Sequence, residues 1–287
     1  MIEKHHIFNW EIESIPDDGG RISALSYKGN QLLCRAPSVF RSPKKDYGLY
    51  ETRPVYGYDD CFPTVEKCKF PGAPEFDVPD HGELCWQKWS LKRDGTVLTF
   101  KTASRKLPVE FTRRLEFSAS TLTWNFEVSN SGSDPIPFLH VMHPLMPLGA
   151  VRGFEMPPCA SVFDEVNQRE ISFRNAKAVE KYLINLNPGK FSMLLLRGVK
   201  DGRMAVIFKF PIKLEIVFPE KLFPSIGIWW NNSGYPDEDG IRRCECAFES
   251  IPGNTSSLEC CFKDGKCLSV MPGSMFSWNV KWNVSEI

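Results

Sequence analysis

The chain has 287 residues, of which 42% are hydrophobic and 13% aromatic, so it can bury a sizeable core. Lys and Arg total 35 and Asp and Glu total 35, with no long run of one sign, which argues against binding to nucleic acid or to an anionic membrane surface. No stretch approaches the roughly 20 apolar residues of a membrane span, so we expect a soluble protein whose ligand is a neutral small molecule.

The amino end carries no apolar signal core and runs directly into strand-like sequence, which predicts a cytoplasmic protein. Ten cysteines fit a reducing compartment. Their closely spaced pairs lack the CxxC pattern of a zinc site, so we favour small buried hydrophobes over disulfides or metal ligands. We predict no metal and no cofactor.

Turn residues and prolines mark the first part of the chain. Gly29-Asn30 has the composition of a tight hairpin turn. From 37 to 80 the alternation of polar and apolar residues fails, because prolines such as Pro43 and Pro54 interrupt any regular ladder. A long irregular segment inside a compact β domain is usually functional, so we expect it to form one wall of a binding site.

His81 closes this segment, between Asp80 and Gly82 and close to Trp86 and Trp89. An imidazole beside flat apolar faces can contact one ligand, as in sugar sites. A turn histidine next to two core tryptophans is the alternative interpretation, and these residues alone do not separate the two.

Residues 109–117 and 122–128 each alternate apolar and polar side chains, and the short turn between them predicts an antiparallel hairpin. Arg113 is in phase with the apolar face of its run, which indicates an inward-pointing cation. Asp-Gly pairs supply the positive φ angles of tight hairpins, and three of them separate strand-like runs, at 94–95, 201–202 and 264–265.

Residues 138–146 form an apolar run that two histidines interrupt. His140 and His143 point to opposite faces of an extended strand, so only one of them can enter a given cavity. Pro144 ends ladder pairing directly after His143 and places that ring at a strand end, where clefts form. We favour His143, although either histidine could be a satisfied core residue.

The only candidate helix covers about 174–184 and has weak helical spacing and no clear cap, so a loop remains an alternative. Strand alternation returns in 204–210 and again in 276–284. The pattern as a whole predicts an all-β protein, with two large antiparallel sheets packed face to face or a wide barrel, in one domain over 1–287.

Trp229 and Trp230 lie in a strand-like run, and adjacent strand residues point to opposite faces. One of them can therefore stack on a ligand while the other is buried in the core. The sequence does not fix which one, and we assign ligand contact to Trp230.

Glu249 ends the run 242–249, just before a Pro-Gly turn, so it also lies at a strand end. A titratable side chain in an apolar strand is costly unless it is partnered or useful, although a solvated surface carboxylate is the alternative. If Glu249 faces His143, the two form an acid and base pair that needs no metal or cofactor.

Taken together, the motifs resemble those of the galactose mutarotase-like superfamily, which contains the aldose 1-epimerases. No single motif is specific, but the ordered set extends over most of the chain. The matching segments are 57–64, 80–82, 143–145, 227–231, 247–250 and 271–273.

The resemblance implies a β-supersandwich whose concave face holds a sugar, and cofactor-free interconversion of its anomers. By position, His143 resembles the general acid that protonates the ring oxygen, and Glu249 resembles the general base that takes the proton from the anomeric hydroxyl. His81 resembles the second histidine, which hydrogen-bonds the sugar near its ring oxygen.

Two departures from the family pattern concern sugar binding. An Asn-Arg pair is expected upstream of the His-Gly motif, and Arg53 is the nearest counterpart here. The family aspartate that holds sugar hydroxyls has no evident counterpart near Trp229, and we assign part of that role to Asp60. The identity of the sugar therefore stays open.

Three functions remain possible on this sequence. The first is a cytosolic aldose 1-epimerase for a free, uncharged monosaccharide, as a monomer or homodimer. The second is a sugar-phosphate 1-epimerase, with Arg53, Arg113 or Arg243 holding the phosphate. The third is a carbohydrate-binding protein without catalysis; a polysaccharide lyase or hydrolase would call for a longer, more charged cleft.

Overall fold

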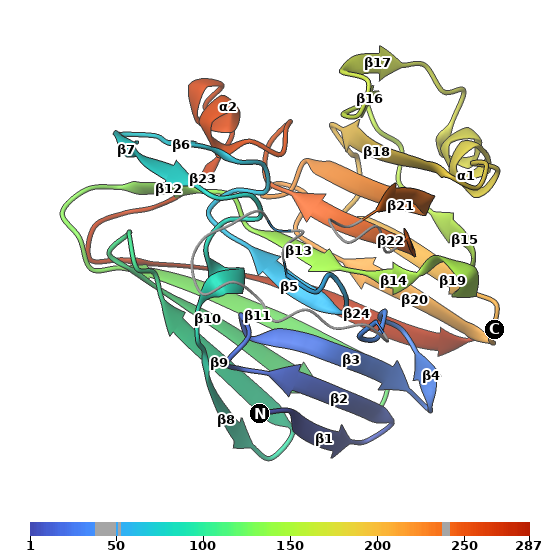
Figure 1. Ribbon diagram of the computed structural model, residues 1–287, viewed down its shortest axis with the longest axis horizontal. Coiled ribbons are helices and arrows are strands. Elements are labelled where there is room, and N and C mark those ends of the chain that lie inside the picture. The colour runs from blue at the N-terminus through green and yellow to red at the C-terminus, as the bar shows by residue number, and fades with distance from the viewer. Residues whose placement is uncertain (38–49, 51–52, 237–241) are drawn as a thin grey trace.

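A computed structural model describes residues 1–37, 50, 53–236 and 242–287 (Figure 1). The described chain is mostly antiparallel β-sheet, as predicted. The largest sheet has eight strands in the order β15 (Val151–Glu155), β19 (Arg203–Phe208), β20 (Ile212–Val217), β24 (Met275–Glu286), β11 (Thr121–Asn130), β10 (Val109–Phe117), β9 (Val97–Ala103) and β8 (Ser90–Asp94).

Two six-stranded sheets lie opposite it. The first has the order β1 (Glu3–Ile7), β2 (Trp10–Ile15), β3 (Arg21–Tyr27), β5 (Tyr58–Cys61) and β13 (Val141–Pro144), with β4 (Asn30–Gln31) paired to β3. The second has the order β14 (Met146–Pro147), β22 (Arg242–Ile251), β21 (Ser225–Pro236), β18 (Lys190–Arg197), β16 (Ser161–Asp164) and β17 (Arg169–Ile171). Because β13 lies beside β22, the two sheets join edge to edge into one layer.

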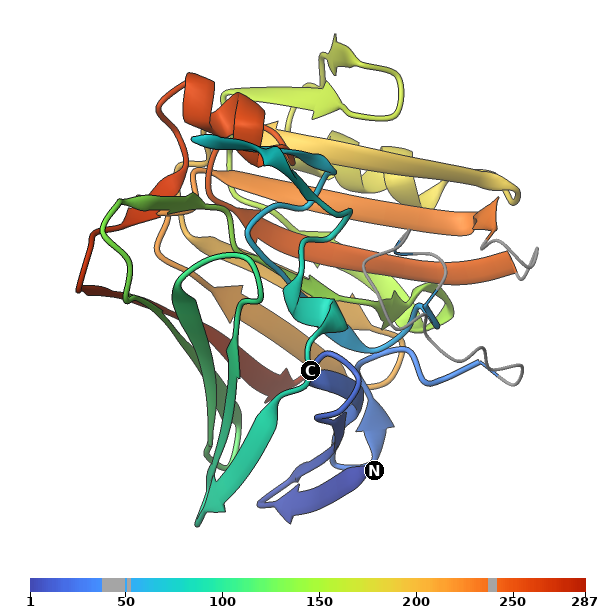
Figure 2. The same cartoon turned by 60° about the vertical axis from the view of Figure 1, so that its left-hand side comes forward.

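Short elements complete the described chain. They are the two-stranded pairs β6 (Cys68–Phe70) with β7 (Ala73–Val78) and β12 (Ile136–Phe138) with β23 (Leu268–Val270), the helices α1 (Ala176–Ile184) and α2 (Leu258–Lys263), and the 3₁₀ helices η2 (Leu84–Trp86) and η3 (Leu148–Ala150). Figures 1 and 2 show α2 beside the β6 and β7 pair at one end of the molecule. No helix within these ranges is long and apolar enough to cross a membrane.

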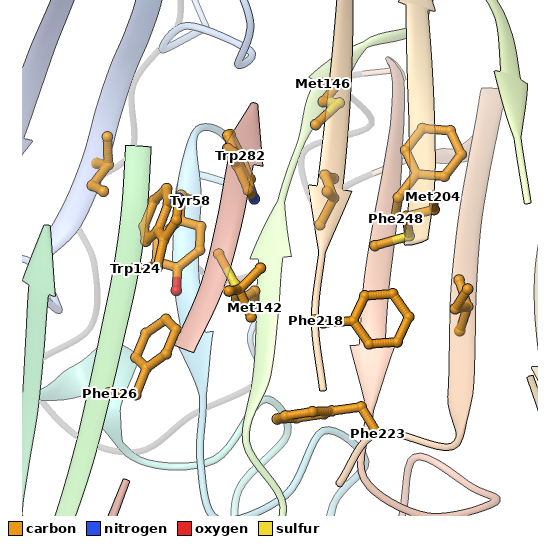
Figure 3. Close-up of a cluster of buried hydrophobic side chains, with 14 of the residues drawn as sticks. Tyr58, Trp124, Phe126, Met142, Met146, Met204, Phe218, Phe223, Phe248 and Trp282 are labelled. Atoms are coloured by element: carbon orange, nitrogen blue, oxygen red, sulfur yellow. The ribbon is translucent and has the colours of Figure 1, made fainter. Parts of the chain in front are cut away.

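The core fills the space between the two layers, and its side chains come from alternating positions of the facing strands. In β11 every second residue is buried, which confirms the alternation predicted for the 109–128 hairpin. Trp124 of β11 packs against Trp282 of β24 and against Tyr58 of β5, with ring centroids 5.1 and 4.6 Å apart (Figure 3). This packing fixes β5 against the larger sheet, and β5 carries part of the site described below.

The predicted helix is α1, which begins at Ala176. Its cap is Asn175, whose side-chain oxygen accepts a hydrogen bond from the Ala178 backbone amide at 3.0 Å. The second helix, α2, was not predicted, because a six-residue helix is too short to show helical periodicity.

The three Asp-Gly pairs have three different roles. Gly95 has a φ of 56° and closes the β8 and β9 hairpin, as predicted. The hairpin prediction is wrong for 201–202, which links β18 in one layer to β19 in the other; glycine is needed there because a Cβ at Gly202 would lie 1.9 Å from the Phe218 carbonyl oxygen. It is also wrong for Gly265, which follows the end of α2 with a φ of 67°.

The segment from 37 to 80 contains three short strands, β5 to β7, although its sequence does not alternate. In β5 all four residues are buried, so neither face of the strand is exposed to solvent and burial does not alternate along it. The part of the segment at 38–49 and 51–52, with Pro43, lies outside the described residues.

Candidate active site

A pocket of about 390 Å³ opens where the two six-stranded sheets meet. The predicted wall is present, since residues between 50 and 80, among them Val65, line it. The lining also includes Tyr50, His81, His143, Trp229, Arg243 and Glu249.

His143 on β13 and Glu249 on β22 face each other across this junction. The distance from His143 Nε2 to Glu249 Oε1 is 3.8 Å, and both side chains are buried. Gly227 on β21 leaves room for the side chains around it, because a Cβ there would lie 2.8 Å from Ile251 Cδ1, 3.0 Å from Met193 Cε and 3.1 Å from Glu249 Oε2. The two strand ends that the sequence analysis singled out, 106 positions apart, therefore converge on one pocket.

Burial shifts the two members of this pair in opposite directions. It raises the pKa of Glu249 to about 8, an effect that the nearby His81 partly offsets. It holds the pKa of His143 well below its usual value, and the neighbouring His81 lowers it further. Near neutral pH the unliganded pair therefore shares one acidic proton, which is on the carboxyl of Glu249, while the imidazole of His143 is neutral and keeps a single N–H.

His81 reaches the pocket from a strained turn. Its φ is 60°, and Gly82 follows with a φ of 70°, where a Cβ would lie 2.0 Å from the Phe62 carbonyl oxygen. Nδ1 of His81 lies 3.0 Å from Asp80 Oδ2, and its ring lies 4.8 Å from that of His143. The backbone that Gly82 permits thus brings the second histidine beside the first.

Tyr50 is a site residue that the sequence analysis did not find. Its hydroxyl donates a hydrogen bond to Asp59 Oδ2 at 2.8 Å and lies 3.2 Å from His143 Nδ1. Its ring stacks on that of His81, with centroids 3.7 Å apart. One tyrosine in an irregular segment has no pattern to mark it, and the burial of its partner Asp59 in β5 is visible only in the structure.

The structure corrects the assignment of ligand contact to Trp230. Trp230 is buried in the core, with its ring 5.7 Å from that of Phe154, whereas Trp229 lines the pocket. The Nε1 of Trp229 donates to Glu245 Oε1 at 3.2 Å, which holds the indole in place. The two neighbours point to opposite faces of the strand, as predicted, but strand alternation alone does not determine which face lies toward the core.

The structure also places Asp60 and Arg53 outside the pocket lining. Asp60 is fully buried, where it pairs with Arg113 and lies 3.0 Å from His140 Nε2. Arg53 is equally buried and pairs with Asp18 at 2.8 Å. Both predicted substrate contacts are therefore structural, because each charge is already neutralised behind the pocket.

Three described side chains have the residue types of a metal site: one ligand atom each from Cys61, His81 and His143 lies within 4.8 Å of the others. Burial raises the pKa of Cys61 well above its usual value and so favours the thiol over the metal-binding thiolate. We assign no metal to this group, and metal-independent chemistry stays a prediction.

The arrangement of the two packed antiparallel layers is the galactose mutarotase-like fold, because the chain superimposes over its whole length on solved structures of that kind. Similar solved structures span the whole chain. Slr1438 from Synechocystis is 16% identical with a TM-score of 0.76, and the match covers 100% of this chain and 96% of that one. A galactose mutarotase related enzyme from Lactobacillus acidophilus is 14% identical with a TM-score of 0.70, covering 100% and 98%.

A third similar structure, a galactose mutarotase-like protein from Clostridium acetobutylicum, is 17% identical with a TM-score of 0.65 and covers 100% of this chain and 99% of that one. No family model and no curated protein matches the sequence. At these identities the likeness establishes the fold and leaves the activity to be argued from the site.

Proposed function

We propose that the protein interconverts the α and β anomers of a free monosaccharide by general acid and base catalysis, without a cofactor. The observation that carries this proposal is the buried pair of His143 and Glu249, whose facing atoms lie 3.8 Å apart in one pocket. Opening a hemiacetal ring requires one proton to be delivered and another to be removed, which is what such a pair supplies.

In the proposed cycle, His143 serves the ring oxygen and Glu249 serves the anomeric hydroxyl. The shared proton passes from Glu249 to His143 as the sugar binds. His143 then protonates the ring oxygen while Glu249 takes the hydroxyl proton, the bond from C1 to the ring oxygen breaks, and an open-chain aldehyde forms. Rotation about C1–C2 presents the other carbonyl face, and closure returns each proton to the group that gave it.

The pocket supports a sugar of one ring. Its volume of about 390 Å³ lies at the small end of ligand pockets. Its lining includes the aromatic side chain of Trp229 and the polar side chains of His81 and Gln168. We propose that Trp229 stacks on the apolar face of the ring while His81 binds near the ring oxygen.

The test is exchange NMR on a panel of hexoses and pentoses. We expect the protein to accelerate exchange between α and β signals for at least one sugar. Saturable sugar binding without accelerated exchange would indicate a carbohydrate-binding protein instead, and no effect on any sugar would contradict the proposal.

The pH profile of catalysis follows from the one-proton pair. Above pH 8 the carboxyl of Glu249 loses the shared proton, since its pKa is about 8, and we expect kcat/KM to fall there. His143 gains a second proton only well below its usual pKa, so we expect no acidic loss near pH 6. Exchange rates measured between about pH 5 and pH 10, after subtraction of the spontaneous rate, check this; a rate that still rises through pH 9 would contradict it.

A second candidate function, epimerisation of a sugar phosphate, is favoured by Arg243. Arg53 and Arg113 are committed to buried carboxylates, but Arg243 lines the pocket. Within the described residues, the carboxylate that pairs with Arg243 is that of Glu245, 3.8 Å from Arg243 Nε. This Nε is buried and has no hydrogen-bond partner among the described residues. Glu245 already accepts hydrogen bonds from Trp229 and Asn231.

This candidate predicts that inorganic phosphate competes with the sugar and that Arg243→Gln weakens the inhibition by about 10- to 100-fold, because a charge-assisted contact is lost. Arg242→Gln is the matched control, since Arg242 is exposed on the same strand. The inhibition constant of phosphate for the exchange reaction is the measurement. Indifference to phosphate in the unmodified protein would rule out this candidate and leave the first one.

A further inference from the structure

Tyr50 contacts both histidines of the pocket. It is buried, its ring stacks on His81 at an interplanar angle of 9°, and its hydroxyl lies 3.2 Å from Nδ1 of His143. The same hydroxyl donates to Asp59. A single oxygen therefore joins His143 to a carboxylate that lies outside the pocket lining.

The charges around Asp59 fix the direction of these hydrogen bonds. Asp59 lies between two buried cations, with Oδ2 at 3.1 Å from Arg21 Nη1 and 3.5 Å from Arg53 Nη1. Because the two guanidinium groups can only donate hydrogen bonds, the Asp59 carboxylate between them serves as an acceptor. The single proton of the Tyr50 hydroxyl therefore points to Asp59, and its oxygen is left to accept from His143.

We infer that Tyr50 is a positioning residue that holds His143 in the tautomer with hydrogen on Nδ1 and thereby makes Nε2, the nitrogen facing Glu249, the reacting atom. In the other tautomer the lone pair of Nδ1 would oppose the lone pair of the tyrosine oxygen, because the hydroxyl proton is committed to Asp59. When His143 becomes an imidazolium, its Nδ1–H keeps the same acceptor. The effect on catalysis rests on the proposed function, whereas the assignment of the His143 tautomer is independent of it.

The tautomer can be measured directly by ¹⁵N–¹H correlation NMR of the imidazole rings. The chain has five histidines, and a His143→Gln variant assigns the signal of interest. We expect hydrogen on Nδ1 of His143 in the unmodified protein, in the absence of any sugar. Hydrogen on Nε2 would overturn the inference without any mutation of Tyr50.

Tyr50→Phe keeps the ring and its stacking on His81 but removes the hydroxyl. We expect the His143 signal to move toward the Nε2–H form and kcat to fall by about 10- to 100-fold, with KM changed by less than about threefold. Tyr58→Phe is the matched control, because its hydroxyl also donates to a buried carboxylate, that of Asp60, and it should leave the His143 signal unchanged.

The outcomes separate the two proposals. A fall in kcat with an unchanged tautomer would mean that Tyr50 acts only as packing and would overturn the positioning role. A shifted tautomer with unchanged kcat would overturn its catalytic consequence. An Nδ1–H tautomer in an unmodified protein that accelerates no exchange would support the inference about Tyr50 while contradicting the proposed function.

Discussion

Replacing Glu249 with glutamine should remove most of the anomer exchange and at the same time stabilise the folded protein in alkaline solution. Glutamine has the shape of glutamate but can neither take nor return a proton, so the pair with His143 loses one of its two functions. A positioned acid or base contributes roughly 10²- to 10⁴-fold, and we expect kcat to fall by that amount.

The gain in stability follows from the pKa of Glu249, which is raised from 4.5 to about 8 by burial. Between these values the unfolded chain has released the proton and the folded protein has not, so the unfolded state gains stability as pH rises. Above pH 8 the folded protein must bury a carboxylate. One pKa unit corresponds to about 1.4 kcal/mol, so the free energy of unfolding of Glu249→Gln should exceed that of the unmodified protein by a few kcal/mol at pH 9.

Urea unfolding of the two proteins at about pH 4 and pH 9 measures this difference, which should be small at the lower pH. Glu180→Gln is the control, because Glu180 is also buried but accepts the Phe154 amide hydrogen bond away from the pocket. The control should keep the exchange rate. Wild-type exchange in Glu249→Gln would contradict its role in catalysis, and equal stability at pH 9 would contradict the raised pKa.

His143 and Glu249 could be found from the sequence because each interrupts an apolar run close to the end of its strand. A titratable group in such a position costs free energy unless it is paired, so the interruption itself is a signal. The same reasoning found the hairpin of β10 and β11, since alternation reports burial directly. The strand pattern does not show which face of β21 lies toward the pocket. For this reason ligand contact was assigned to Trp230, whereas Trp229 lines the pocket.

Asp60 and Arg53 show a different limit. Each has the residue type that binds sugars or phosphates, but its counter-charge lies far away in the sequence: Arg113 is 53 positions from Asp60, and Asp18 is 35 positions from Arg53. Pairing across such distances depends on how the sheets stack, which local pattern does not encode. Tyr50 escaped notice for the same reason, because its partners Asp59 and His143 come from two strands.

Because Asp60 pairs with Arg113, we expect its substitution to affect stability and not sugar binding, contrary to the role first assigned to Asp60. Asp60→Asn should destabilise the fold by about 3 to 5 kcal/mol and leave KM within about twofold, because removing one member of a buried ion pair leaves the other charge uncompensated. Arg113 is enclosed by aromatic rings, with its guanidinium carbon 4.9 Å from the centroid of Trp89 and 4.4 Å from that of Phe100, and cannot reach water.

The stability that Asp60 contributes should decrease at acidic pH, as expected for a carboxylate whose pKa is lowered by pairing. Burial alone would raise the pKa of Asp60, but Arg113 and His140 outweigh it and lower the pKa overall. The stabilisation is therefore present above the unfolded pKa of about 4 and is lost as pH falls through the lowered folded value. Asp60→Asn should lack this acid-sensitive part of the stability.

The double variant Asp60→Leu, Arg113→Met separates charge from packing. Replacing both partners of a buried pair with apolar side chains is often neutral or stabilising, so it should recover much of the stability that Asp60→Asn loses. Urea unfolding and exchange kinetics on the three proteins give both quantities. A raised KM with an unchanged unfolding midpoint in Asp60→Asn would indicate that Asp60 contacts the sugar. The expected result, a loss of stability with an unchanged KM, would show that this carboxylate stabilises β5 through its pairing with Arg113.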